Sequence, residues 1–174
     1  IYPNPLKTSE GGKAVAVKKA KGDLILLLDG DNLLPEKNWI RKMVHPLMVD
    51  DKLIGSEALF YTHRAGDGFI DRYCALIGMN DPLCYCLGAY DRYSLLSGKW
   101  TGLPVQSRKR KGYLEIKLIE GSIPTIGSNG CIFRRSIFQK YPELSKDYLF
   151  DMDILEFLCQ KQGPQTFAKV NVGV

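Results

Sequence analysis

The apolar run Leu24–Leu28 constrains the fold most, because five consecutive apolar residues give a strand no polar face to turn toward water. Such a strand belongs in the middle of a sheet that helices cover on both faces. Helix and strand patterns alternate around it: residues 13–22 and 35–48 are predicted helices, and residues 52–61 are a second predicted strand. This order predicts an α/β fold with a mostly parallel sheet and right-handed crossovers.

The second half of the chain has shorter and less regular patterns. Two similar octapeptides at residues 71–78 and 91–98 are predicted to be short helices, each with Asp at its start and Gly at its end. Alternation over residues 113–120 predicts a half-exposed strand, and residues 127–130 a turn. Residues 131–141 are predicted to form a strand and a short helix, and residues 150–164 a helix that stops at Gly163 and Pro164.

Length and composition limit the organisation of the chain. With 174 residues, 45% of them hydrophobic, we expect one domain over residues 1–174. Five cysteines, an odd number without CxxC spacing, argue against a disulfide framework or a zinc site and favour a reducing, cytoplasmic setting. The longest apolar run has five residues, far short of the ~20 that span a bilayer. Because the chain begins at Ile1, we expect it to be part of a longer protein.

Two carboxylates, Asp29 and Asp31, follow the apolar strand directly. In an open α/β sheet, ligands bind beyond the carboxyl ends of the strands. Residues i and i+2 of an extended segment point to the same side, roughly 6 to 7 Å apart, so two carboxylates can share a divalent cation. Gly30 between them leaves room for a phosphate to approach the backbone. The alternative is a polar turn made of good turn-forming residues.

Three ordered blocks of sequence resemble the inverting family 2 glycosyltransferases with the GT-A fold. "KGDLILLLDGDNLLPEKNWIRKM" resembles the strand that ends in a DxD motif, "GSNGCIFRRSIF" the small-residue strand before the acceptor region, and "LFDMDILEFLCQKQG" the acidic start of the helix that carries the base. The resemblance implies a GT-A-like three-layer sandwich with a Rossmann-like sheet. It also implies that the strand, helix and strand that hold the nucleotide base are missing before residue 1.

The resemblance implies a reaction, namely inverting hexosyl transfer from a nucleotide-diphosphate sugar to a hydroxyl of a glycan or lipid-linked acceptor. A Mn²⁺ or Mg²⁺ cofactor would neutralise charge on the departing diphosphate. Asp151 falls on the catalytic base, whereas Phe150 stands where the family has glutamate, and the habitual basic pair falls on Arg134 and Arg135. The implied metal ligands are Asp29 and Asp31, the donor-binding residues are Lys13, Asp29, Gly30 and Asp31, and the acceptor or sugar contacts are Ser128 and Asn129.

Several of these residues have a structural alternative. Asp151 is also suited to be a helix N-cap, with Asp153 stabilising the first turn. Asn129, which precedes a glycine, is equally well explained by a turn. As a base, Asp151 would need partial burial to raise its pKa, and its apolar neighbours could provide it.

Two other functions remain open from the sequence. Haloacid-dehalogenase-like, Mg²⁺-dependent phosphohydrolases also carry Asp-x-Asp after an apolar strand, but their later acidic residues follow a strand, whereas Asp151 and Asp153 are predicted to begin a helix. A non-catalytic sugar-binding module of the same fold is the other alternative.

The net charge of +5 is concentrated in four consecutive basic residues. This cluster could associate with the anionic inner face of a membrane, and a solvated loop is the alternative. Without interleaved aromatic residues it does not predict nucleic-acid binding. The cluster consists of Arg108, Lys109, Arg110 and Lys111.

Overall fold

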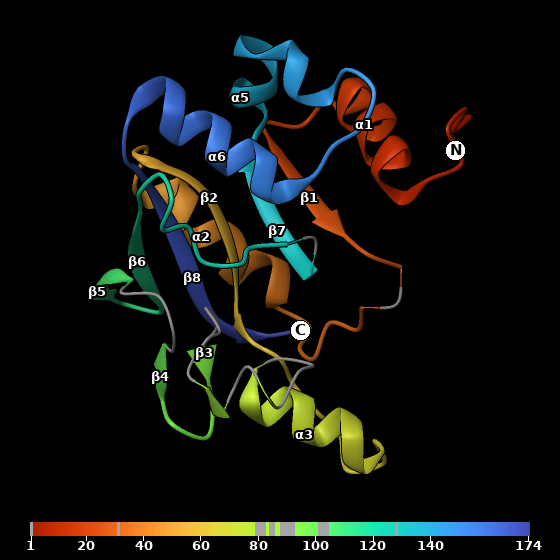
Figure 1. The fold of residues 1–174 in the computed structure, drawn as a ribbon. Coiled ribbons are helices and arrows are strands. Elements are labelled where there is room, and N and C mark those ends of the chain that lie inside the picture. Colours follow the sequence, from red (N-terminus) through yellow and green to blue (C-terminus); the bar gives the residue numbers. More distant parts are fainter. Residues whose placement is uncertain are drawn as a thin grey trace.

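A six-stranded sheet with the strand order β1-β7-β2-β8-β6-β5 forms the centre of the molecule (Figure 1). The structure is a computed structural model and describes residues 2–30, 32–78, 83, 86–87, 93–100, 105–127 and 129–174. A second, two-stranded sheet pairs β3 with β4. The elements are α1 (Ser9–Lys19), β1 (Leu24–Leu28), α2 (Trp39–Val49), β2 (Leu53–Phe60), α3 (Phe69–Ile77), β3 (Tyr93–Ser94), β4 (Lys99–Trp100), β5 (Gln106–Arg110), β6 (Tyr113–Leu118), β7 (Asn129–Arg134), α5 (Arg135–Lys140), a 3-10 turn at Pro142–Ser145, α6 (Asp151–Gln162) and β8 (Gln165–Gly173).

Helices and strands combine in one layered fold, so the predicted α/β class is confirmed, but the predicted mostly parallel sheet is wrong. Within the described six-stranded sheet, β2 and β8 pair in parallel, whereas the other four pairings are antiparallel. Two features cause this. β7 enters between β1 and β2 and runs opposite to both, and the tight turn at Lys111 and Gly112 makes β5 and β6 a hairpin, which is necessarily antiparallel.

β1 lies at the edge of the described sheet, so its predicted central position is also wrong. It pairs with β7 on one side, in a register that joins Leu24 to Arg134 and Leu27 to Cys131. Its apolar composition reflects cover on both faces, because Ile25 and Leu27 pack in the core with α1 and α6, while Leu24 and Leu26 pack against the core under α2. Five apolar residues therefore indicate covered faces and not a central place in the sheet.

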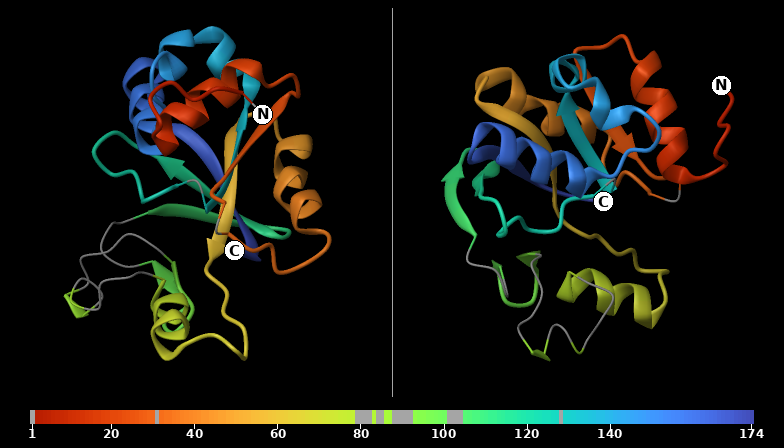
Figure 2. Two further views of the ribbon diagram at one scale, coloured as in Figure 1. Left: turned by 90° about the vertical axis from the view of Figure 1, so that its right-hand side faces the viewer. Right: turned by 45° about the horizontal axis from the view of Figure 1, so that its top comes forward.

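Helices cover both faces of the sheet (Figure 2). α2 lies on one face, where the fully buried Trp39 and Met43 pack against Ile132 and Val170. α1, α5 and α6 lie on the other face and enclose the larger apolar cluster. We call these the α2 face and the α6 face.

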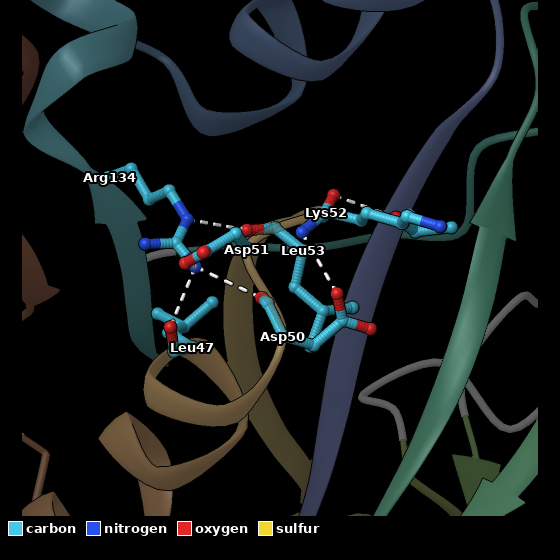
Figure 3. Close-up of polar contacts among 7 residues, drawn as sticks. Leu47, Asp50, Asp51, Lys52, Leu53 and Arg134 are labelled. Atoms are coloured by element: carbon cyan, nitrogen blue, oxygen red, sulfur yellow. Dashed lines mark hydrogen bonds and ion pairs between the residues drawn. The ribbon is translucent and has the colours of Figure 1, made fainter.

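Arg134 fixes the end of α2 against the sheet (Figure 3). Its Nε donates to the carbonyl of Leu53 (2.8 Å), and its Nη2 donates to the carbonyls of Leu47 (2.7 Å) and Asp50 (3.0 Å). Leu47 lies in the last turn of α2 and Asp50 is its C-cap, where carbonyls lack partners within the helix, and Leu53 begins β2. Arg134, one of the two basic residues that the family resemblance singled out, thus has a structural role. Pro46 lies inside α2, which continues to Val49.

Three further local predictions need correction. The second octapeptide is not a helix where it is described: Tyr93–Ser94 form β3 and a turn follows, while residues 91 and 92 lie outside the described residues. The basic residues 108–110 belong to β5 and not to a loop. Asn129 and the following glycine begin β7. Within the described part of the chain, no helix has the length and hydropathy to cross a membrane.

Candidate active site

A row of side chains with unusual chemistry crosses the sheet on its α6 face. Glu57 of β2 is paired in register with Cys131 of β7 and with Lys169 of β8, and Cys131 is paired with Leu27 of β1. Residues paired in register point to the same face of a sheet. Leu27 and Cys131 belong to the core under α6, so Glu57 and Lys169 point there as well. Two charged residues therefore lie in an otherwise apolar layer.

Glu57 and Lys169 form a buried ion pair. Their side chains are 3% and 5% exposed, and the Lys169 ammonium donates to Oε2 of Glu57. The other carboxylate oxygen, Oε1, accepts a hydrogen bond from the backbone N–H of Gly127 at 2.8 Å. Glu57 thus ties the chain just before residue 128 to the centre of the sheet. Because a buried pair gains little net stability over apolar residues of similar size, its place here suggests a role beyond stability.

Asp151 begins α6 on the same face and is only 3% exposed. Its Oδ1 is buried and has no hydrogen-bond partner among the residues that the structure describes. The helix N-cap is Phe150, and no side chain caps the helix, so the alternative reading of Asp151 as an N-cap is wrong. Asp153, the next acidic residue, is exposed and accepts a hydrogen bond from the hydroxyl of Tyr148. A buried carboxyl oxygen without a partner costs about 1 to 3 kcal/mol, which marks Asp151 as a functional candidate.

Burial raises the pKa of Asp151 from 3.8 to about 6. The positive charge of Lys13 opposes this rise, whereas the negative charges of Glu57 and Asp29 add to it. Burial also raises the pKa of the Cys131 thiol well above its ordinary value, with the charges of Glu57 and Asp151 adding to the rise and that of Lys169 opposing it, so Cys131 is a poor nucleophile. Asp151 thus titrates close to neutral pH, under the influence of charged groups from α1, from β2 and from the residue that follows β1.

Asp29 follows β1 directly and forms an ion pair with α1. The Nζ of Lys13 lies 3.2 Å from Oδ1 of Asp29, and the two side chains are 16% and 36% exposed. The carbonyl of Asp29 accepts from the backbone N–H of Asn32 at 3.2 Å, so the chain does turn here. A side chain placed at Gly30 would meet no atom within 4 Å, so the backbone at Gly30 borders open space. The strand end is thus both a turn and an accessible polar site.

The structure brings together three of the sequence-predicted residues, namely Lys13, Asp29 and Asp151, with Gly30 next to them. Asp31 and Ser128 lie outside the described residues, and of Asn129 the backbone but not the side chain is described. Among the residues that are described, no group of three or more His, Cys, Asp or Glu side chains is arranged to hold a metal ion. The described carboxylate at the strand end, Asp29, is paired with a lysine, so the metal site at Asp29 and Asp31 stays a prediction.

Sequence reasoning missed Glu57 and Lys169. Each stands in the middle of an apolar strand, in "LIGSEALF" and "QTFAKVNVG". A charged residue within a buried strand was the available signal, because such a residue is rarely buried unless it is paired. The pairing itself, across 112 positions, is visible only in the fold.

Comparisons of the chain with protein-family models, with curated proteins and with solved structures found no match.

Proposed function

We propose that this chain is the catalytic domain of a metal-assisted, inverting glycosyltransferase with a GT-A-like fold. It would transfer a hexosyl group from a nucleotide-diphosphate sugar to a hydroxyl of a glycan or lipid-linked acceptor. The observation that carries this proposal is the buried carboxyl of Asp151, whose Oδ1 has no hydrogen-bond partner among the described residues, near Lys13 and Asp29. The three sequence blocks that resemble family 2 glycosyltransferases support it.

Asp151 has the properties that a general base needs. Proton transfer is most efficient when the pKa of the base lies near the working pH. With a pKa raised to about 6, Asp151 is ionised at neutral pH and is a stronger base than an ordinary carboxylate. Its free Oδ1 can accept a hydrogen bond from the acceptor hydroxyl. As the hydroxyl oxygen of the acceptor attacks the anomeric carbon, the carboxylate of Asp151 takes the hydroxyl proton, and the bond from the anomeric carbon to the diphosphate breaks.

The donor diphosphate is proposed to lie at the end of β1. The ammonium of Lys13 can contact its oxygens, and the open space at Gly30 lets a phosphate approach the backbone. Asp29 and Asp31 are the residues proposed to hold Mn²⁺ or Mg²⁺, an ion that supplies charge neutralisation at the leaving group. Ser128 and Asn129 are proposed to contact the sugar or acceptor, because they follow Gly127, whose N–H donates to Glu57, and the charge of Glu57 acts on Asp151.

The two alternatives receive less support. In a phosphohydrolase of the haloacid-dehalogenase type the later acidic residues follow a strand, whereas Asp151 and Asp153 stand in the first turn of α6. A non-catalytic sugar-binding module would not need a desolvated carboxyl of raised pKa.

The proposal is tested by thermal unfolding with UDP-, GDP- and dTDP-sugars, each with and without Mn²⁺. We expect at least one donor to raise the unfolding temperature in a Mn²⁺-dependent way, and Asp31→Ala to abolish that rise. Asp23→Ala is the matched control, because Asp23 is exposed just before β1, at the opposite end from the predicted site. Stabilisation by no donor would overturn the proposal, and release of phosphate from an aryl phosphate with Mg²⁺ would favour the phosphohydrolase.

A further inference from the structure

A basic pocket lies on the α2 face, on the opposite side of the sheet from Asp151. It encloses about 410 Å³ between α2, the turn of the β5–β6 hairpin and the end of β8. α2 is the helix that stands apart from α1, α5 and α6 in Figure 2. A pocket of this size can hold a small ligand. Four of its lining residues are basic: Arg41, Lys42, His45 and Lys111.

The positive charge of this pocket is not neutralised by the described residues that line it. None of the described residues that line it is acidic. Lys42 is paired with Glu36 at 2.6 Å, outside the pocket lining, whereas Arg41 and Lys111 form no ion pair with any residue that the structure describes. Holding cations from two elements around one pocket costs repulsion energy, and an anion between them relieves it.

Apolar and hydrogen-bonding groups complete the pocket. Val170 and Pro46 are buried and contribute an apolar wall, which strengthens electrostatic attraction in the pocket. Burial raises the pKa of Tyr113, with Asp50 adding to the rise, so its phenol remains a hydrogen-bond donor. The amide side chain of Asn171 is exposed at the same pocket. A neutral donor beside permanent cations suits a ligand with several acceptor oxygens.

We propose that this pocket binds a phosphate group, carried either by a soluble phosphate compound or by a lipid headgroup. The planar guanidinium of Arg41 matches two phosphate oxygens, and the Lys111 ammonium supplies a second charge from the facing hairpin. The basic residues 108–111 therefore do not act as one group. Arg110 is paired with Glu115 at 2.7 Å, whereas Lys111, at the turn, faces α2. The site is separate from the proposed donor site and does not depend on it.

The test is calorimetric titration with inorganic pyrophosphate in EDTA, on a Lys13→Gln background that removes the cation of the proposed donor site. We expect saturable binding that weakens about tenfold or more in Arg41→Gln/Lys111→Gln. The control Lys21→Gln/Lys117→Gln removes the same charge from exposed residues away from the pocket and should bind as the background does. Because both pairs are exposed, thermal unfolding should show that all variants fold.

Sedimentation with vesicles distinguishes the two sources of phosphate. Vesicles of phosphatidylcholine with phosphatidic acid are compared with phosphatidylcholine alone, using the same variants. Loss of binding in Arg41→Gln/Lys111→Gln, but not in the control, supports the proposed pocket. Such a loss with pyrophosphate identifies a soluble phosphate compound as the ligand, and such a loss with phosphatidic acid identifies a lipid headgroup. Absence of saturable binding to both probes, or an equal loss in the two double variants, overturns the proposal. Neither measurement involves turnover, so the result is independent of glycosyl transfer.

Discussion

Both faces of the sheet bury an apolar cluster, the larger one on the α6 face, but the two faces differ in how their buried polar groups are satisfied. On the α2 face, the indole of Trp39 donates to the carbonyl of Gly173 (2.7 Å), and the hydroxyl of Ser56 donates to the carbonyl of Met43 (2.8 Å). On the α6 face, an ion pair is buried and a carboxyl oxygen has no partner. One face satisfies its buried polar groups with backbone carbonyls, whereas the other keeps charge out of water.

Selection for stability explains the buried polar groups of the α2 face but does not by itself explain those of the α6 face. Apolar packing with satisfied polar groups is the expected solution for a core. A desolvated carboxyl of raised pKa opposes folding at neutral pH and persists where another requirement outweighs it. If the buried charged groups of the α6 face serve function while the buried polar groups of the α2 face serve stability, substitutions on the two faces should change different properties of the protein.

The largest effect is expected from Asp151→Asn. An amide cannot accept the acceptor proton, so we expect kcat to fall by about 10²–10⁴-fold, the usual contribution of a general base. Asp153→Asn is the control, because Asp153 is exposed and bonds to Tyr148. Initial rates with a nucleotide-sugar donor found in the thermal panel measure both. Unchanged turnover in Asp151→Asn would remove Asp151 from catalysis and make the non-catalytic module the better interpretation.

The next largest effect concerns the buried ion pair. Lys169→Met leaves Glu57 charged, buried and without its cation, so we expect the free energy of unfolding to fall by about 3 to 5 kcal/mol. In Glu57→Leu/Lys169→Met no charge remains, and most of that loss should be regained, apart from about 1 kcal/mol for the unpaired N–H of Gly127. Urea unfolding of the three proteins measures this. A double variant as unstable as Lys169→Met would mean that packing, and not buried charge, sets the cost.

The raised pKa of Asp151 predicts how stability depends on pH. The folded protein holds the Asp151 proton up to about pH 6, whereas the unfolded chain releases it at 3.8. The unfolding free energy should therefore fall as the pH rises through this window, by about 3 kcal/mol in total. Urea unfolding of the wild type and of Asp151→Asn at several pH values isolates this contribution. Parallel curves for the two proteins would mean that the carboxyl has an ordinary pKa.

A smaller effect is expected from Lys13→Met. The ammonium of Lys13 lowers the pKa of Asp151, so its removal should raise that pKa further. The acid limb of the pH profile of kcat/KM should then move to higher pH, which a purely structural role would not produce. Lys19→Met changes an exposed residue on the same helix and should leave the limb in place. A limb that moves to lower pH in Lys13→Met would contradict the geometry of the site.

The sequence predicted the layered α/β class and the strand end that carries Asp29, because hydrophobic periodicity and turn-forming residues determine secondary structure from neighbouring positions in the chain. It failed on strand direction, since an apolar pattern is the same whichever way β7 runs. It left the role of Asp151 open because the N-cap and the first helical position are adjacent residues, and a sequence pattern does not fix the start of a helix to within one residue. Glu57 and Lys169 were missed because their pairing spans 112 positions and depends on β2 and β8 lying side by side.

The smallest effect is expected on the α2 face. Ser56→Ala removes the hydrogen bond to the carbonyl of Met43, so we expect a loss of about 1 kcal/mol in the free energy of unfolding. Ser56 neighbours Glu57 in β2 but points to the opposite face, so kcat and the acid limb of the pH profile should not change. Urea unfolding at two pH values and initial rates test this. A pH-dependent loss of stability, or a clear loss of activity, would show that the two faces are coupled and that their buried polar groups do not have separate roles.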